Sequence, residues 1–354
     1  MRLVFLGSGD FSVPALRAVH GAGHETACVV TMPDRPAGRG RKLCPTPAKE
    51  AALELGLPIW QPARMRGPEA EFALREMKPE LGIVVDFGQI IPGRILEIPP
   101  LGFINLHASL LPRHRGASPI QRAILDGDPV TGVTTMFMDE GLDTGAMILQ
   151  RETPIRADDT AGSLGARLAE LGAGLLVETL DQLSGGRAPR RIQDDSLATY
   201  APRLRKEDGL VRWTGAGKQV YNQVRGLDPW PGAYTFWRGS RLKILKVSLE
   251  RSPETRASDP VETDSKKGKF ATGTETGMET GAGTLPETGT APGGTPGAIL
   301  KVIRGVGFLV STGDRPILIE RVQPENGKPM GAWDFANGYG VAPGERFEPY
   351  PAEQ

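Results

Sequence analysis

Short apolar runs alternate with helical stretches through the first half of the chain. The apolar runs cover residues 3–6, 27–31, 81–85 and 103–107, and apolar residues at helical spacing lie around 13–19 and 46–55. Strands that alternate with helices form βαβ units, so we predict a mostly parallel sheet with helices on both faces. Two more strands, at 131–138 and 146–154, and a helix at 161–183 complete this α/β domain.

After residue 213 the pattern becomes one of short alternating strands. A helix near 217–225 precedes five runs, at 233–237, 242–249, 298–303, 307–311 and 316–322. Strands without intervening helices predict a small OB-like β-barrel or sandwich. The tract from about 251 to 297 lacks apolar residues to bury, so we predict a disordered insertion there. The expected boundaries are 1–189 for the α/β domain, 190–207 for a linker and 208–350 for the β domain.

Charge and cysteine content narrow the class of protein. Lys and Arg total 42, as do Asp and Glu, so a nucleic-acid partner would have to meet a local basic patch. The two cysteines, Cys28 and Cys44, fit neither a disulfide framework nor a metal site, which favours a reducing compartment. The chain has no apolar signal segment and no membrane-length run. We therefore expect a cytoplasmic protein that binds neither a metal nor a membrane.

An amide and an imidazole lie two residues apart in the run at 103–107. Side chains alternate along a strand, so Ile104 and Leu106 face one way while Asn105 and His107 face the other. An acidic, glycine-rich turn at 138–145 contains Asp143 and is able to bring a carboxylate back to the strand. Amide, imidazole and carboxylate are the parts of an acyl-transfer site. We predict that Asn105, His107 and Asp143 are catalytic.

Three other interpretations compete with this one. The first makes His107 a core histidine with unrelated polar neighbours. The second is a hydrolase triad of Ser109, His107 and Asp143, but the chain lacks the G-x-S-x-G nucleophile elbow. The third is a nicotinamide site after the first strand, where Ser12 stands in place of the last glycine of the dinucleotide fingerprint.

The block around these residues resembles the folate-dependent formyltransferase family. It consists of Ser109-Leu110-Leu111-Pro112-Arg113-His114-Arg115-Gly116, Pro119-Ile120-Gln121-Arg122 and Gly141-Leu142-Asp143-Thr144-Gly145. The resemblance extends from residue 1 to about 249 and resumes after 297. The basic segment 33–43 and the β-rich C-terminal domain are similar to the branch of the family that acts on tRNA. This implies a Rossmann-like catalytic domain and a β-barrel domain that helps to hold tRNA.

The resemblance implies a formyl transfer from 10-formyltetrahydrofolate to initiator methionyl-tRNA, in support of translation initiation. The α-amine of the esterified methionine attacks the formyl carbon, and a tetrahedral oxyanion forms. Asn105 and protonated His107 would donate hydrogen bonds to this oxyanion. Asp143 would orient the imidazole, favour its charged form and take the proton of the amine. No covalent intermediate and no metal is required, and we expect a monomer.

Binding residues are implied in the same way. For folate they are Ser109, Leu110, Leu111, Pro112, Phe87, Gln89 and Ile90. For tRNA they are Arg35, Arg39, Arg41, Lys42 and Lys206. Four of these cations lie within eight residues of a Pro- and Gly-rich loop, which suits contacts to phosphates. Asp86-Phe87 stands where many members of the family carry a small residue and a tyrosine, and Gly7-Ser8-Gly9 stands where Gly-Thr-Pro is commoner.

Two further hypotheses stay open. One keeps formyl transfer but changes the acceptor to a sugar-nucleotide amine, glycinamide ribotide or water, and the basic loop and the β-rich domain argue against it. The other is a catalytically silent RNA-binding module, against which Asn105, His107 and Asp143 argue. His114 lies beside the folate segment and has no assigned role.

Overall fold

Contacts divide the chain into two units. The computed structural model describes residues 1–37, 42–249 and 294–348, without the side chains of residues 37 and 42. The first unit comprises Met1–Val211 and Asn222–Tyr234, and the second comprises Arg212–Tyr221 and the described residues from Thr235 onward. The chain therefore leaves the first unit, returns to it and leaves it again. The linear boundaries expected from the sequence stay a prediction.

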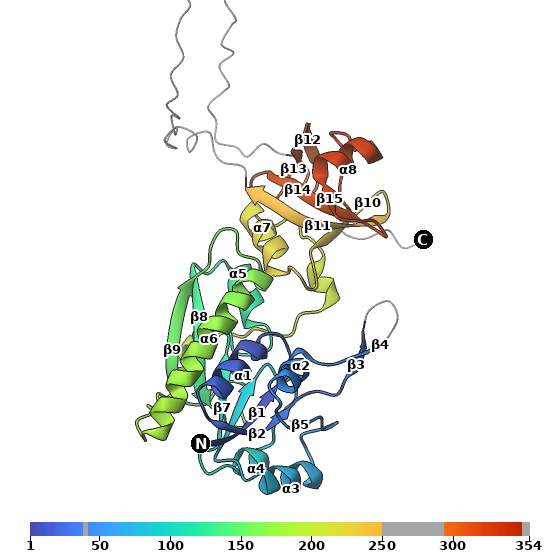
Figure 1. Cartoon of the computed structure of the whole chain (residues 1–354). Coiled ribbons are helices and arrows are strands. Elements are labelled where there is room, and N and C mark those ends of the chain that lie inside the picture. Colours follow the sequence, from blue (N-terminus) through green and yellow to red (C-terminus); the bar gives the residue numbers. More distant parts are fainter. Residues whose placement is uncertain (38–41, 250–293, 349–354) are drawn as a thin grey trace, which may run out of the picture. The chain divides into compact units, whose positions relative to one another are not determined.

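A mixed sheet forms the centre of the first unit (Figure 1). Its seven strands run in the order β5-β2-β1-β6-β7-β8-β9. Their bounds are β1 (Arg2–Gly7), β2 (Glu25–Val30), β5 (Ile59–Trp60), β6 (Leu81–Val85), β7 (Phe103–His107), β8 (Val130–Phe137) and β9 (Met147–Pro154). Neighbours from β5 to β7 are parallel, whereas β8 is antiparallel to β7 and to β9. This confirms the predicted mostly parallel sheet, to which the last two strands add an antiparallel edge.

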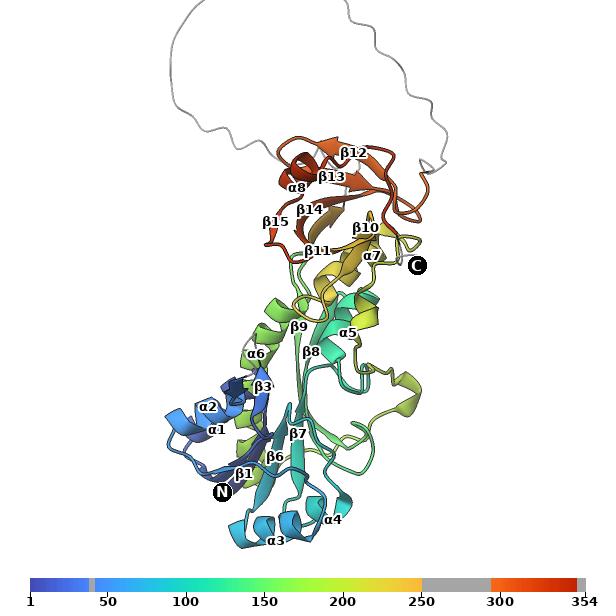
Figure 2. The same cartoon turned by 90° about the vertical axis from the view of Figure 1, so that its right-hand side faces the viewer.

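Helices cover both faces of this sheet. One face carries α1 (Ser12–Gly21), α2 (Pro47–Glu54) and α6 (Ala161–Ser184), and the other carries α3 (Pro68–Met77) and α4 (Gly93–Leu96) (Figure 2). Alternation within β1 supplies both cores, since Leu3 and Phe5 belong to one apolar cluster while Val4 and Leu6 belong to the other. Helix α5 (Pro119–Asp126) packs against α6. No helix in the described part has the length and hydrophobicity that crossing a membrane requires.

The long helix α6 begins with a capping box. The Thr160 hydroxyl accepts a hydrogen bond from the Ser163 backbone N–H at 3.2 Å, and the Ser163 hydroxyl accepts one from the Thr160 N–H at 3.0 Å. Each hydroxyl thereby satisfies a backbone donor that has no partner inside the helix. This explains why the helix starts at Ala161, where the sequence predicts it.

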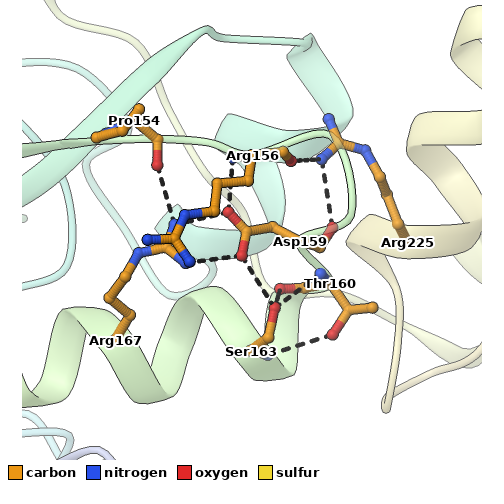
Figure 3. Close-up of polar contacts among 7 residues, drawn as sticks. All are labelled: Pro154, Arg156, Asp159, Thr160, Ser163, Arg167 and Arg225. Atoms are coloured by element: carbon orange, nitrogen blue, oxygen red, sulfur yellow. Dashed lines mark hydrogen bonds and ion pairs between the residues drawn. The ribbon is translucent and has the colours of Figure 1, made fainter. Parts of the chain in front are cut away.

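A group of polar contacts beside this cap joins distant parts of the first unit (Figure 3). Both carboxylate oxygens of Asp159 accept hydrogen bonds from the Arg167 guanidinium, at 2.7 and 2.6 Å. Arg225, near the end of α7 (Gly217–Gly226), donates to the backbone carbonyls of Arg156 and Asp159 at 3.1 and 3.3 Å. The segment Asn222–Tyr234 is thereby held against the loop that precedes α6.

The second unit contains an antiparallel sheet. Its strands follow the order β10-β11-β14-β13-β12, and β15 pairs with β14. The bounds are β10 (Tyr234–Trp237), β11 (Ser240–Leu249), β12 (Ile299–Ile303), β13 (Gly307–Val310), β14 (Ile317–Pro324) and β15 (Met330–Gly331), followed by α8 (Ala332–Tyr339). Trp213 stacks on Phe347 with ring centroids 5.3 Å apart. The five predicted strands are all present, whereas α8 was not predicted.

The predicted disordered insertion, about 251–297, lies outside the described residues except for its last four positions.

Candidate active site

The candidate site lies where β7 ends, at the carboxyl edge of the parallel strands. Ile104 and Leu106 enter the core beneath α1, α2 and α6, whereas Phe103 enters the opposite core. Because side chains alternate along β7, Asn105 and His107 lie on the same face of the strand as Phe103. Asn105 pairs with Val84 of β6 on one side, which places it inside the sheet. Parallel α/β sheets bind their ligands beyond this edge.

His107 is held by contacts at both ring nitrogens. The residue is 5% exposed. Its Nε2 lies 3.0 Å from the carbonyl oxygen of His114, and its Nδ1 lies 3.7 Å from Oδ2 of Asp143. A carbonyl oxygen can only accept a hydrogen bond, so Nε2 carries the proton. The ring then presents Nδ1 toward Asp143 and the space beyond the strand.

The turn that carries Asp143 is fixed from two directions. Asp143 has a left-handed backbone, with φ of 54°, and its Oδ2 accepts a hydrogen bond from the Gly116 N–H at 2.8 Å. The side-chain amide of Gln193 donates to the carbonyls of Asp143 and Gly145 at 2.7 and 2.8 Å. The structure therefore brings Asp143 to His107, as the sequence predicts.

Gly116 occupies a position that other residues would strain. Its φ is 119°, and a Cβ atom there would lie 2.7 Å from the carbonyl oxygen of Ala201. Only glycine adopts this backbone freely and leaves room for the neighbouring chain. The close approach lets the Gly116 N–H reach the Asp143 carboxylate.

The segment after α6 passes along the site, and sequence reasoning missed this. The Arg115 N–H donates to the Thr199 carbonyl at 2.8 Å, and the Ala201 N–H donates to the Arg115 carbonyl at 2.7 Å. The buried Arg115 guanidinium donates to Gln193 Oε1 at 3.1 and 2.9 Å and to Asp195 Oδ1 at 2.7 Å. Part of the stretch interpreted as a linker thus holds the active-site loop in place.

The segment implied in folate binding is tied to β8. The buried Ser109 hydroxyl donates to the Arg113 carbonyl at 2.6 Å, and the Leu111 N–H donates to the Thr134 hydroxyl at 3.2 Å. Leu110 is half-buried, and Pro112 follows a cis peptide bond. The two hydrogen bonds restrain the backbone of residues 109–113.

In the loop after β6, two of the three side chains implied in folate binding are turned inward. Phe87 is 3% exposed and belongs to the core between β6 and α4, whereas Ile90 is 78% exposed. The Gln89 side chain turns inward, where Oε1 accepts from the Met65 N–H at 2.8 Å and Nε2 donates to the Pro62 carbonyl at 3.3 Å. A folate contact from Gln89 would therefore come from its backbone.

Gly9 and Asp86, which lie after β1 and β6, contact each other. A Cβ atom on Gly9 would lie 2.0 Å from Oδ2 of Asp86, so the Asp86 carboxylate fills the space of a side chain at position 9. Asp86 follows β6 with φ of 50°. Although part of the residue is exposed, the surrounding strand ends withdraw water from its carboxyl group and, with the negative charge of Asp10, raise its pKa to about 6.

The cations implied in tRNA binding are described in part. Arg35 is exposed on β3 (Arg35–Ala37), which pairs with β4 (Lys42–Cys44) in a hairpin. Arg39 and Arg41 lie outside the described residues, and Lys42 is described by its backbone alone. Lys206 is exposed on the short 3-10 helix Lys206–Gly209.

Potential metal ligands are scattered over the part of the chain that the structure describes. Among residues 1–37, 42–249 and 294–348, no group of three or more His, Cys, Asp or Glu side chains is placed to hold a metal ion.

The comparisons with known proteins agree on one family. A family model described as formyl transferase matches residues 1–180, and one described as the C-terminal domain of formyl transferase matches residues 203–340. The methionyl-tRNA formyltransferase of Moorella thermoacetica is 46% identical over 345 residues, which is 98% of each chain. That of Symbiobacterium thermophilum is 43% identical over 354 residues, with 100% of this chain and 97% of the relative covered.

Solved structures show the same fold at low sequence identity. An N-formyltransferase from Helicobacter canadensis, solved with folinic acid and dTDP-3-aminofucose, aligns with a TM-score of 0.59 at 17% identity and covers 91% of this chain and 99% of its own. HypX from Aquifex aeolicus, solved with tetrahydrofolic acid, has a TM-score of 0.56 at 17% identity, covering 98% of this chain and 48% of HypX. The two family models together match most of the chain, and the bacterial relatives align with nearly all of it. The chain therefore belongs to the formyltransferase family.

Proposed function

We propose that this chain transfers the formyl group of 10-formyltetrahydrofolate to the α-amine of methionine on initiator methionyl-tRNA. The observation that carries the proposal is the identity of 43 to 46% with methionyl-tRNA formyltransferases over nearly the full length of both chains. This likeness extends through the β-rich C-terminal unit. The location of the reaction follows from its acceptor, so we place the enzyme in the cytoplasm.

The transfer breaks one C–N bond and forms another. The neutral amine attacks the formyl carbon, whose oxygen becomes an oxyanion in the tetrahedral intermediate. Collapse of the intermediate expels N10 of tetrahydrofolate, which takes up a proton, while the amine loses one. The protein must therefore stabilise negative charge on one oxygen and move one proton.

Three side chains divide these tasks. The Asn105 amide and a protonated Nδ1 of His107 are donors on one strand face, and they would stabilise the oxyanion. Asp143 lies 3.7 Å from that nitrogen, so its carboxylate stabilises a positive charge on the ring. We assign to Asp143 the uptake of the amine proton, either directly or through water.

Folate would bind across the strand ends. We propose that residues 109–112 and the backbone of the loop 87–90 line its pocket. The restraints that β8 and Gln89 impose on these segments support this role, because a preformed backbone binds a flat ring with little loss of conformational entropy.

We propose that the basic segment 33–43 contributes to tRNA binding. We expect the double variant Arg39→Ala/Arg41→Ala to bind tRNA more weakly and to lower the slope of log affinity against log salt concentration by about 1 per lost phosphate contact. The measurement is a set of tRNA binding isotherms at increasing salt. Arg75→Ala/Lys78→Ala removes the same charge near the opposite edge of the sheet and serves as the control. A slope unchanged by the loop variant would contradict this role.

An acceptor panel tests the proposed function as a whole. The enzyme is mixed with 10-formyltetrahydrofolate and, in separate reactions, charged initiator tRNA, a sugar-nucleotide amine, glycinamide ribotide or buffer. We expect formylation of the charged tRNA at a kcat/KM well above that of the other acceptors. Preference for a small amine, or folate hydrolysis in buffer alone, would reassign the acceptor. The monomeric state stays a prediction, which light scattering in solution tests.

A further inference from the structure

A second histidine lies directly behind the active site and has no role in the chemistry described so far. His114 is 2% exposed, and its backbone is left-handed with φ of 58°. Its ring Nε2 lies 2.7 Å from Oδ2 of Asp128, and its Nδ1 lies 3.4 Å from the Thr199 hydroxyl. The Thr199 hydroxyl also accepts the His114 backbone N–H at 2.8 Å. Both the ring and the backbone of His114 are therefore fixed.

Asp128 links this histidine to a rigid element. Its backbone N–H donates to the Ala123 carbonyl at 3.0 Å, at the end of α5. Its second carboxylate oxygen, Oδ1, accepts a hydrogen bond from Arg113 at 2.7 Å. The half-buried carboxylate thus holds two consecutive residues of the active-site loop, one on each oxygen.

The carbonyl of His114 is the group that meets the catalytic ring. It accepts the hydrogen bond from Nε2 of His107 at 3.0 Å. The direction of a carbonyl follows from the backbone angles of its residue, and here those angles are left-handed and cost free energy unless the surroundings impose them. The contacts of the His114 ring with Asp128 and Thr199 supply that restraint.

We propose that His114 and Asp128 form a positioning pair that keeps Nε2 of His107 donating to the His114 carbonyl, so that Nδ1, which carries the second proton during catalysis, faces Asp143 and the formyl oxygen. The pair acts through the His114 carbonyl and does not touch the substrates. If the loop relaxes, this carbonyl turns away, the two tautomers of His107 become closer in free energy, and the ring loses its orientation. The proposal rests on the proposed formyl transfer for its kinetic consequence, but its structural consequence stands alone.

The direct test is the tautomer of His107, read from the ring nitrogen chemical shifts in the full-length protein labelled with nitrogen-15 histidine. The chain contains four histidines, so single substitutions assign every signal. In the wild-type protein we expect the neutral His107 ring to carry its proton on Nε2. A neutral ring that is protonated on Nδ1 would overturn the proposal without any variant.

Two variants separate positioning from packing. His114→Phe fills the space of the ring without its hydrogen bonds, and Asp128→Asn keeps the shape of the carboxylate but removes its charge. In each variant we expect a mixture of His107 tautomers and a kcat lowered about 10- to 100-fold at an unchanged KM for folate, because small displacements in a reacting geometry have effects of this size. His20→Phe, on the exposed face of α1, is the matched control and should change neither quantity.

The outcomes distinguish the two proposals. Folded variants with wild-type kcat and an unaltered His107 tautomer would overturn the positioning role. A wild-type enzyme that does not formylate charged tRNA would overturn the proposed function, while the tautomer measurement would still decide the role of His114.

Discussion

His107→Ala is expected to lower kcat for formyl transfer by about 10²–10³-fold, the usual effect of removing one donor to an oxyanion. We expect losses of similar size for Asn105→Ala and Asp143→Ala. The affinity for tRNA should stay nearly unchanged in all three, because these side chains lie at the strand edge and act on one oxygen and one proton. Single-turnover rates at saturating substrates, with tRNA binding measured in parallel, give the comparison.

The three residues should also behave as a unit. Since Asp143 stabilises the charged ring of His107, part of its effect disappears with that ring. The losses in the double variant His107→Ala/Asp143→Ala should therefore be smaller than the product of the two single losses. His20→Ala controls for the loss of an imidazole elsewhere. A large loss of tRNA affinity in these variants, together with a wild-type protein that forms no formylated tRNA, would instead favour the RNA-binding module.

Asp159→Ala is expected to lower the free energy of unfolding of the first unit by about 2–4 kcal/mol. Asp159 is 3% exposed, and its removal leaves the Arg167 guanidinium without its bidentate partner (Figure 3). Breaking a buried pair from one side is strongly destabilising, and the 24% exposure of the Arg167 side chain moderates the effect. Urea unfolding followed by far-ultraviolet circular dichroism measures the change. Asp158→Ala, at the exposed neighbouring position, should have little effect.

The same ion pair predicts how stability depends on pH. Burial by itself raises the pKa of the Asp159 carboxyl, but hydrogen bonds from Arg167 and from the Arg156 N–H outweigh burial, so the pKa lies below its ordinary value. A carboxyl group with a lowered pKa stabilises the folded state above its unfolded pKa of about 3.9, and this stability is lost as the pH falls through the folded pKa. Asp159→Asn should therefore unfold with a shallower acid limb. An acid limb identical to that of the wild type would contradict this.

Strands of the central sheet could be predicted because a buried strand appears in the sequence as a short run of apolar residues. Residues 81–85 are apolar throughout, as a strand covered on both faces must be, and the strand β6 spans those residues. Helix α8 has no comparable sequence signal. It begins directly after β15 at Gly331, which provides no side-chain cap, and its eight residues are too few for a clear helical period.

The part of the site that depends on short-range sequence patterns could be predicted. Alternation put Asn105 and His107 on one face, and a glycine-rich turn returned Asp143. The residues that hold this arrangement were not predictable, because their partners are distant in sequence. Arg115 meets Gln193 at a separation of 78 residues, and His114 meets Thr199 at 85. No periodicity or turn signal in the chain encodes such pairs.

The central claim is that one formyl group passes directly from folate nitrogen to an amine at the end of β7. Following a radiolabelled formyl group from 10-formyltetrahydrofolate in the presence of charged initiator tRNA tests this most directly. We expect the label to appear as N-formylmethionine on the tRNA with wild-type enzyme and to do so about 10²–10³-fold more slowly with His107→Ala. Label released as free formate, or equal transfer by both proteins, would contradict the claim.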